Sequence, residues 1–189
     1  MHLSRRTFAL TFAFSLALAA APAAAKELAG ATMPDTLTVA GKTLKLNGMG
    51  LRKKMMFKVY VGGLYLEAPS SNAAAILAAD APKAMTMHFL RSIEKQKLVD
   101  AYKEGFEANA AQKAAAQKAN VDKFYTTVTD VKEGSVTTYT YAPGTGTVVS
   151  RDGKDVTTIE GKEFAEVLFS LWLGPKPPSE DLQKGLLGR

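Results

Sequence analysis

The chain has 189 residues, a formal net charge of +6 and no cysteine. This length suits one domain with a real hydrophobic core, and the absence of cysteine excludes disulfides, thiolate metal sites and cysteine nucleophiles. His2 and His88 are the two histidines, too few for a histidine metal cluster, so we predict no metal and no cofactor. Because charges of both signs are interspersed, the modest basicity indicates solubility and a preference for anionic ligands.

Residues 1–25 have the three parts of an export signal. The pair Arg5-Arg6 precedes an apolar run, residues 8–21, and small residues follow up to Ala25. The run is shorter than the roughly 20 apolar residues of a membrane span. The stretch SRRTF also resembles the twin-arginine motif, so that route and the general secretory route both remain open. We predict cleavage near Ala25 and a periplasmic protein at residues 26–189, without a transmembrane anchor or a nucleic-acid partner.

The first elements of the mature chain are predicted to be strands. Apolar alternation interrupted by turn residues predicts short strands over Thr36–Ala40 and Thr43–Leu46, the second ending at Asn47-Gly48. The apolar segment that follows, Leu51–Leu66, is longer than the usual strand of roughly 3–10 residues. We therefore predict a turn or bulge near Lys53-Lys54 and a main strand over Met56–Leu66. The glycines within it, at positions 62 and 63, predict close approach of a helix or ligand.

A short helix is predicted within residues 69–84, and a strand follows at residues 84–91. Ser92 is the predicted N-cap of a long helix, because serine is a favoured capping residue. One face of this helix carries Leu98, Tyr102, Phe106 and Asn109 at helical spacing. An alanine-rich helical continuation leads to residue 128.

The C-terminal third predicts an antiparallel meander and two more helices. Turn residues divide residues 133–161 into alternating segments, and residues 161–174 form an amphipathic pattern. A last short helix has Ser179 as its predicted cap. Helices are inserted between strands or appended after them, without βαβ alternation. The predicted class is therefore α+β with an antiparallel sheet, in a single domain over residues 26–189.

Four side chains are candidates for ligand contacts on spacing alone. Arg52 and Arg91 each end an apolar β segment, where a guanidinium can bind a carboxylate or an enolate oxygen. The alternative is an arginine whose stem packs while its head reaches water. Tyr102 and Asn109 lie two helical turns apart, and each costs about 1–3 kcal/mol if buried without a hydrogen-bond partner. Spacing leaves open whether those partners are backbone groups or a ligand.

Three segments in this order and spacing resemble the chalcone isomerase-like proteins, in particular their exported bacterial branch: LNGMGLRKKMMFKVYVGGLYLEAP, MHFLRSIEKQKLVDAYKEGFEANA and GKEFAEVLFSLWLG. The resemblance implies an open-faced β-sandwich, with a large antiparallel sheet, helices packed on one face and a ligand cleft between them. Plant enzymes of the family close a flavanone ring by conjugate addition of a phenolate to an enone. Related plant members without that activity bind fatty acids and hold the carboxylate with an arginine and a tyrosine.

The resemblance also assigns positions. The family's active-site arginine falls on Arg52, its helix tyrosine on Tyr102 and its helix asparagine on Asn109. Tyr60 stands where the plant enzymes have threonine, and Gly105 stands where they have a helix lysine. Loss of that lysine removes a cation that would attract the nucleophile, and Tyr60 fills space, so efficient chalcone cyclisation is not expected.

The resemblance also implies a cleft threonine or serine near the C-terminal end of the domain, and this position falls on Ser179. The predicted ligand-binding residues are Arg52, Tyr60, Tyr102 and Asn109, with no catalytic residue assigned. We predict a periplasmic, non-catalytic binder of a fatty acid or another small amphipathic or anionic ligand. An isomerase (intramolecular lyase) acting on an enone, or an interaction protein with a vestigial cleft, remain alternatives. The natural ligand and the oligomeric state stay open.

Overall fold

The structure, a computed structural model, describes residues 25–189, so the predicted export signal lies outside the described residues except for Ala25. The strands are β1 (Ala25–Leu28), β2 (Ala31–Pro34), β3 (Thr36–Val39), β4 (Lys42–Lys54), β5 (Phe57–Leu66), β6 (Lys83–Phe89), β7 (Val136–Ala142), β8 (Gly146–Arg151) and β9 (Lys154–Ile159). The helices are α1 (Ala73–Ala78), α2 (Lys95–Ala116), α3 (Lys118–Thr127), α4 (Lys162–Leu173) and α5 (Glu180–Leu186).

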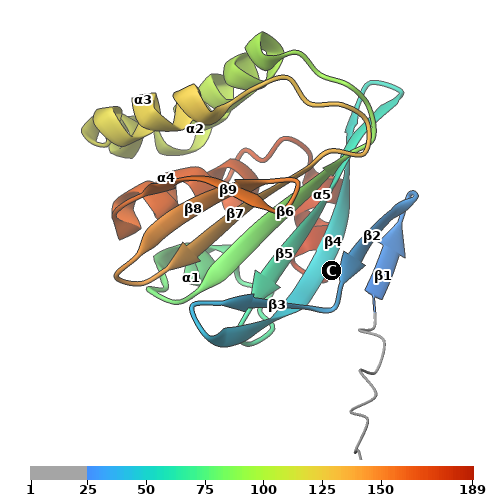
Figure 1. The fold of residues 1–189 in the computed structure, drawn as a ribbon, viewed down its shortest axis with the longest axis horizontal. Coiled ribbons are helices and arrows are strands. Elements are labelled where there is room, and N and C mark those ends of the chain that lie inside the picture. Colours follow the sequence, from blue (N-terminus) through green and yellow to red (C-terminus); the bar gives the residue numbers. More distant parts are fainter. Residues whose placement is uncertain (1–24) are drawn as a thin grey trace, which may run out of the picture.

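Strands β3 to β9 form one antiparallel sheet in chain order, while β1 and β2 form a separate hairpin (Figure 1). The main core lies between the sheet and the helices, where Phe89 and Tyr139 meet Phe124, Leu168 and Trp172. A smaller core covers part of the other face, where β2 packs on β4 and β5. The predicted α+β architecture, with helices packed on one side of an antiparallel sheet, is confirmed. Within residues 25–189, no helix combines the length and the apolar character needed to cross a bilayer.

Strand β4 is longer than predicted. It runs through Asn47-Gly48 to Lys54, because the predicted turn there is a bulge in the pairing with β5. The Asn47 side chain bonds distant backbone, donating to the Ser70 and Leu186 carbonyl oxygens at 3.0 and 2.8 Å. A second register shift follows Arg52, near the predicted position, and the chain reverses at Met55 and Met56. The predicted strand end at Asn47-Gly48 is therefore wrong.

The predicted N-cap of the long helix is also wrong. Helix α2 begins at Lys95, with Glu94 as its N-cap rather than Ser92. Ile93 pairs with Val131 in a β-bridge, so the chain remains extended beyond Ser92. The first turn is instead held by Asp130, whose Oδ1 accepts from the Lys95 N–H at 2.7 Å.

Helix α5 lies directly against the backbone of β4. A Cβ at Gly48 would be 2.1 Å from the Gly185 carbonyl oxygen, and one at Gly50 would be 2.2 Å from the Leu182 carbonyl oxygen. The predicted close approach at Gly62 is present but looser, because a Cβ there would be 3.2 Å from a Leu182 methyl group. Ser179 caps α5 as predicted, with Oγ accepting from the Leu182 N–H at 3.2 Å.

Candidate ligand-binding cleft

A cleft of about 910 Å³ opens between α2 and the helix-covered face of the sheet. Its walls come from the β4–β5 turn, the end of β6, helix α2 and the end of α4. Apolar and aromatic side chains form much of the lining: Val59, Met87, Phe89, Leu98, Leu171 and Trp172. Sites of this size and character hold small organic ligands.

Cations outnumber acids around this cleft. The cationic lining residues are Arg52, Lys54, Arg91, Lys97, Lys132 and Lys176, and the acidic ones are Glu94, Glu104 and Asp130. Glu94 pairs with Lys97 at 3.3 Å. The guanidinium of Arg52 donates to the Lys53 carbonyl oxygen, which leaves most of its five N–H donors for a ligand. Arg91 stacks on the Phe57 ring, 4.7 Å from its centroid.

Two buried phenols lie deep in the same cleft. The Trp172 Nε1–H donates to Tyr60 Oη at 3.0 Å, so the proton of the Tyr60 hydroxyl is left to donate to a ligand. Tyr102 Oη lies 2.8 Å from Tyr139 Oη. One of the two hydroxyl protons forms that bond, and the other can be donated to a ligand. Burial raises the pKa of both Tyr60 and Tyr102 above the ordinary value of 10, so both phenols are neutral donors at pH 7.

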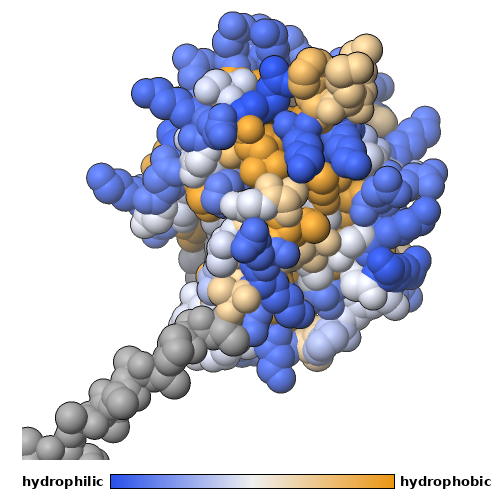
Figure 2. Space-filling view, turned by 90° about the vertical axis from the view of Figure 1, so that its right-hand side faces the viewer, coloured by the Kyte–Doolittle hydropathy of each residue, from blue (hydrophilic) through white to orange (hydrophobic). Residues whose placement is uncertain are grey.

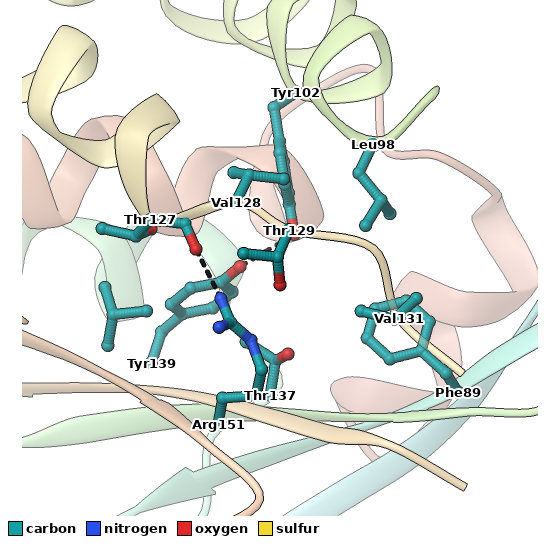
Figure 3. Close-up of a pocket in the computed structure, with 11 residues that line it drawn as sticks. Phe89, Leu98, Tyr102, Thr127, Val128, Thr129, Val131, Thr137, Tyr139 and Arg151 are labelled. Carbon is teal, nitrogen blue, oxygen red and sulfur yellow. Dashed lines mark hydrogen bonds between the residues drawn. The ribbon is translucent and has the colours of Figure 1, made fainter. Parts of the chain in front are cut away.

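A further cation, absent from the residues predicted by sequence, lies beside Tyr102 and its partner Tyr139. Arg151, at the end of β8, extends toward α3 and donates to the Thr127 carbonyl oxygen (Figure 3). It lines a space of about 10 Å³, on the order of one water molecule, next to Tyr102 and Tyr139. Burial raises the pKa of Tyr139, and the charge of Arg151 opposes part of that rise. Strand periodicity could have found this residue, because it lies two positions after the buried Val149.

Of the four predicted ligand residues, Arg52, Tyr60 and Tyr102 line one cleft, whereas Asn109 lies outside its lining. The Asn109 Nδ2 donates to the Gly105 and Lys176 carbonyl oxygens, both at 2.9 Å, and Oδ1 accepts from the Lys176 N–H at 2.8 Å. Asn109 therefore joins α2 to the loop after α4, next to a kink at Ala110. Ser179 caps α5 and likewise is not among the lining residues.

Comparison with known proteins identifies the domain. Residues 25–188 match the sequence model of the family described as chalcone isomerase-like. The chain belongs to the chalcone isomerase-like family. Among solved structures it is similar to the fatty-acid binding protein AtFAP1 of Arabidopsis thaliana, with a TM-score of 0.67 and 13% identity over 87% of this chain and 96% of that chain. At this identity the likeness shows a shared fold. None of the curated proteins compared with the chain matches it.

Gly105 makes the α2 wall of this cleft apolar, because it leaves space that the Leu171 side chain fills. The residue lines the cleft, and a Cβ added there would lie 2.4 Å from Leu171 Cδ2. A lysine at this position, which the family resemblance implies for the plant enzymes, would require Leu171 to move. Leu171 therefore occupies the place that the lysine side chain would need, and the cleft has no cation at this turn of α2.

The hydrogen bonds of Asn109 lead to a stability prediction. We expect Asn109→Ala to lower the free energy of unfolding by about 0.5–1.5 kcal/mol for each hydrogen bond lost to the exposed Lys176 backbone groups. Urea unfolding followed by circular dichroism measures the change. Gln112→Ala, at an exposed position of the same helix, is the matched control. Equal midpoints for the two variants would show that the bridge contributes nothing.

The buried phenols lead to a prediction about alkaline pH. Their pKa values are raised in the folded protein, so their contribution to stability is complete below pH 10 and falls as the pH rises above it. We expect Tyr60, Tyr102 and Tyr139 to ionise together with unfolding, which tyrosinate absorbance and circular dichroism measure in parallel. Tyr60→Phe should make the loss of stability above pH 10 less steep. Ionisation of all three phenols within a folded protein would contradict the burial described here.

Proposed function

We propose that this protein is a periplasmic, non-catalytic binder of a fatty acid or another amphipathic carboxylate. The observation that carries the proposal is one cleft that combines the Arg52 guanidinium and two neutral phenols with an apolar lining. The structurally similar AtFAP1 is a fatty-acid binding protein, which supports this choice of ligand. The periplasmic location rests on the export-signal pattern of residues 1–25.

The head group is recognised by charge and by hydrogen bonds. An ionised carboxylate accepts paired, charge-assisted bonds from a guanidinium, so Arg52 is the primary anchor. Tyr60 lies on the neighbouring strand, directly opposite Arg52 in the β4–β5 register. The free hydroxyl proton of Tyr60 can therefore complete the contact. Each such bond to a charged group contributes about 1.5–3 kcal/mol.

The tail is recognised by burial. The apolar surface along the cleft comes from Met87, Phe89, Leu98 and Leu171. Each methylene group removed from water contributes about 0.8 kcal/mol, so affinity should rise with chain length until the cleft is full. The apolar wall at Gly105 suits a hydrocarbon tail better than it suits the charged nucleophile of a ring closure.

The direct test is to identify what the protein binds. Protein purified from the periplasm is extracted with solvent for mass spectrometry, and the delipidated protein is titrated with a long-chain fatty acid by calorimetry. Trp172, the one tryptophan of the chain, lines the cleft and bonds Tyr60, so its fluorescence should change at the same stoichiometry. We expect one saturable site. An empty extract together with no binding heat would reject the proposal.

A further inference from the structure

The turn between β4 and β5 exposes apolar side chains at its tip. Met55 is 90% exposed, Met56 85% and Phe57 52%, and they are three of the four large exposed hydrophobic residues among residues 25–189. Figure 2 looks onto the side of the molecule that carries this turn and shows apolar surface bordered by hydrophilic side chains. Exposed apolar groups concentrated at one tip indicate an interaction surface.

One residue of this turn is unusual for the backbone conformation that it adopts. Met55 has a left-handed conformation with φ at 55°, where asparagine, aspartate or glycine is preferred. Arg91 partly covers Phe57 by stacking on its ring, whereas the two methionines are almost fully exposed. Neither turn geometry nor core packing accounts for methionine at these two positions, so a contact outside the chain is the better explanation.

The same turn carries a concentrated positive charge. The three apolar residues are flanked by four cations: Arg52, Lys53, Lys54 and Lys58. No acidic residue occurs from Leu51 to Leu66. Two of the three acids of the cleft lining are partly engaged, because Glu94 pairs with Lys97 and Asp130 accepts from the Lys95 N–H. An apolar tip surrounded by cations complements a surface with anionic head groups above hydrocarbon.

We propose that the β4–β5 turn docks this protein onto the surface of an anionic lipid bilayer. The methionines enter the boundary between head groups and acyl chains, and the flanking lysines contact the anionic head groups. Arg52, Lys54, Met55 and Phe57 also line the cleft, so docking brings its mouth against the bilayer. This last consequence rests on the proposed function: an amphipathic ligand can then pass between membrane and cleft without exposing its tail to water.

Vesicle co-sedimentation tests the docking. We expect wild-type protein to bind vesicles of phosphatidylcholine containing phosphatidylglycerol, to bind pure phosphatidylcholine vesicles weakly, and to dissociate at high salt. Two altered proteins, Met56→Ser and the double variant Lys53→Gln with Lys58→Gln, change exposed positions outside the cleft lining. Each should lower the partition coefficient by about tenfold or more.

Matched controls come from the far edge of the sheet and from β1. Val156→Ser changes the fourth exposed hydrophobic residue, and Lys26→Gln with Lys154→Gln removes two exposed lysines. These variants should bind vesicles as the wild type does. Absent vesicle binding, or equal losses for turn and control variants, would overturn the docking proposal. Fatty-acid affinity measured without vesicles is a separate readout, so failure of docking is distinguished from failure of the proposed ligand.

Discussion

Replacing Gly50 with alanine should lower the free energy of unfolding by about 3 kcal/mol. The added methyl group would lie 2.2 Å from the Leu182 carbonyl oxygen and 2.9 Å from the Leu182 Cα. These are backbone atoms of α5, so no side-chain rotation relieves the overlap and the helix must move off β4. The opposing gain, from replacing glycine with alanine in a strand, is only about 0.5–1 kcal/mol. The cost of the clash is therefore larger than this gain, and the substitution destabilises the protein.

Urea unfolding measures this loss, with Lys45→Ala as a control at an exposed position of the same strand. Gly185→Ala tests the contact from the helix side, because its methyl group would lie 2.3 Å from the Met49 carbonyl oxygen. We expect both glycine variants to lose similar stability. A loss below about 1 kcal/mol in both would show that α5 is not held against the strand as described.

Filling the cleft from the α2 side should reduce ligand affinity by about tenfold or more. Ala101 lines the cleft at an exposed position of α2, so Ala101→Phe places a ring where the proposed hydrocarbon tail lies. Displacing about two or three methylene groups back into water costs about 2 kcal/mol. Calorimetric titration with a long-chain fatty acid measures the change.

The control for this variant is Ala115→Phe, which adds the same ring at an exposed position of α2 outside the cleft lining. It should bind the fatty acid as the wild type does. Equal affinity for both variants would mean that the tail lies elsewhere. Unfolding midpoints of the two proteins show whether any loss arises from instability instead.

Much of the fold follows from local sequence pattern. The strand predicted at residues 84–91 and the Ser179 cap depend on neighbouring residues, and the structure confirms both. The two errors have distant causes. Asn47 forms a bulge because it bonds Ser70 and Leu186, and Ser92 is not a cap because Ile93 pairs with Val131. Neither partner can be inferred from the residues that surround Asn47 or Ser92 in the sequence.

Sequence spacing and the family resemblance together predicted Arg52 and Tyr102, and the resemblance alone predicted Tyr60. Arg52, Tyr60 and Tyr102 reach one cleft from two strands and a helix. Helical phase and the family resemblance both placed Asn109 beside Tyr102, but the kink at Ala110 and the bonds to Lys176 direct its amide to the loop after α4. Tertiary contacts, rather than periodicity, decide where such polar side chains point.

The most direct test of the proposed site compares a fatty acid with the alcohol of equal chain length. Calorimetry on the wild type should show a preference for the acid, because Arg52 contacts the ionised head group. In Arg52→Met, which keeps an apolar stem, we expect that preference to fall by about tenfold or more while the alcohol binds as before. A variant that retains the wild-type preference for the acid would contradict the assignment of Arg52 as the anchor.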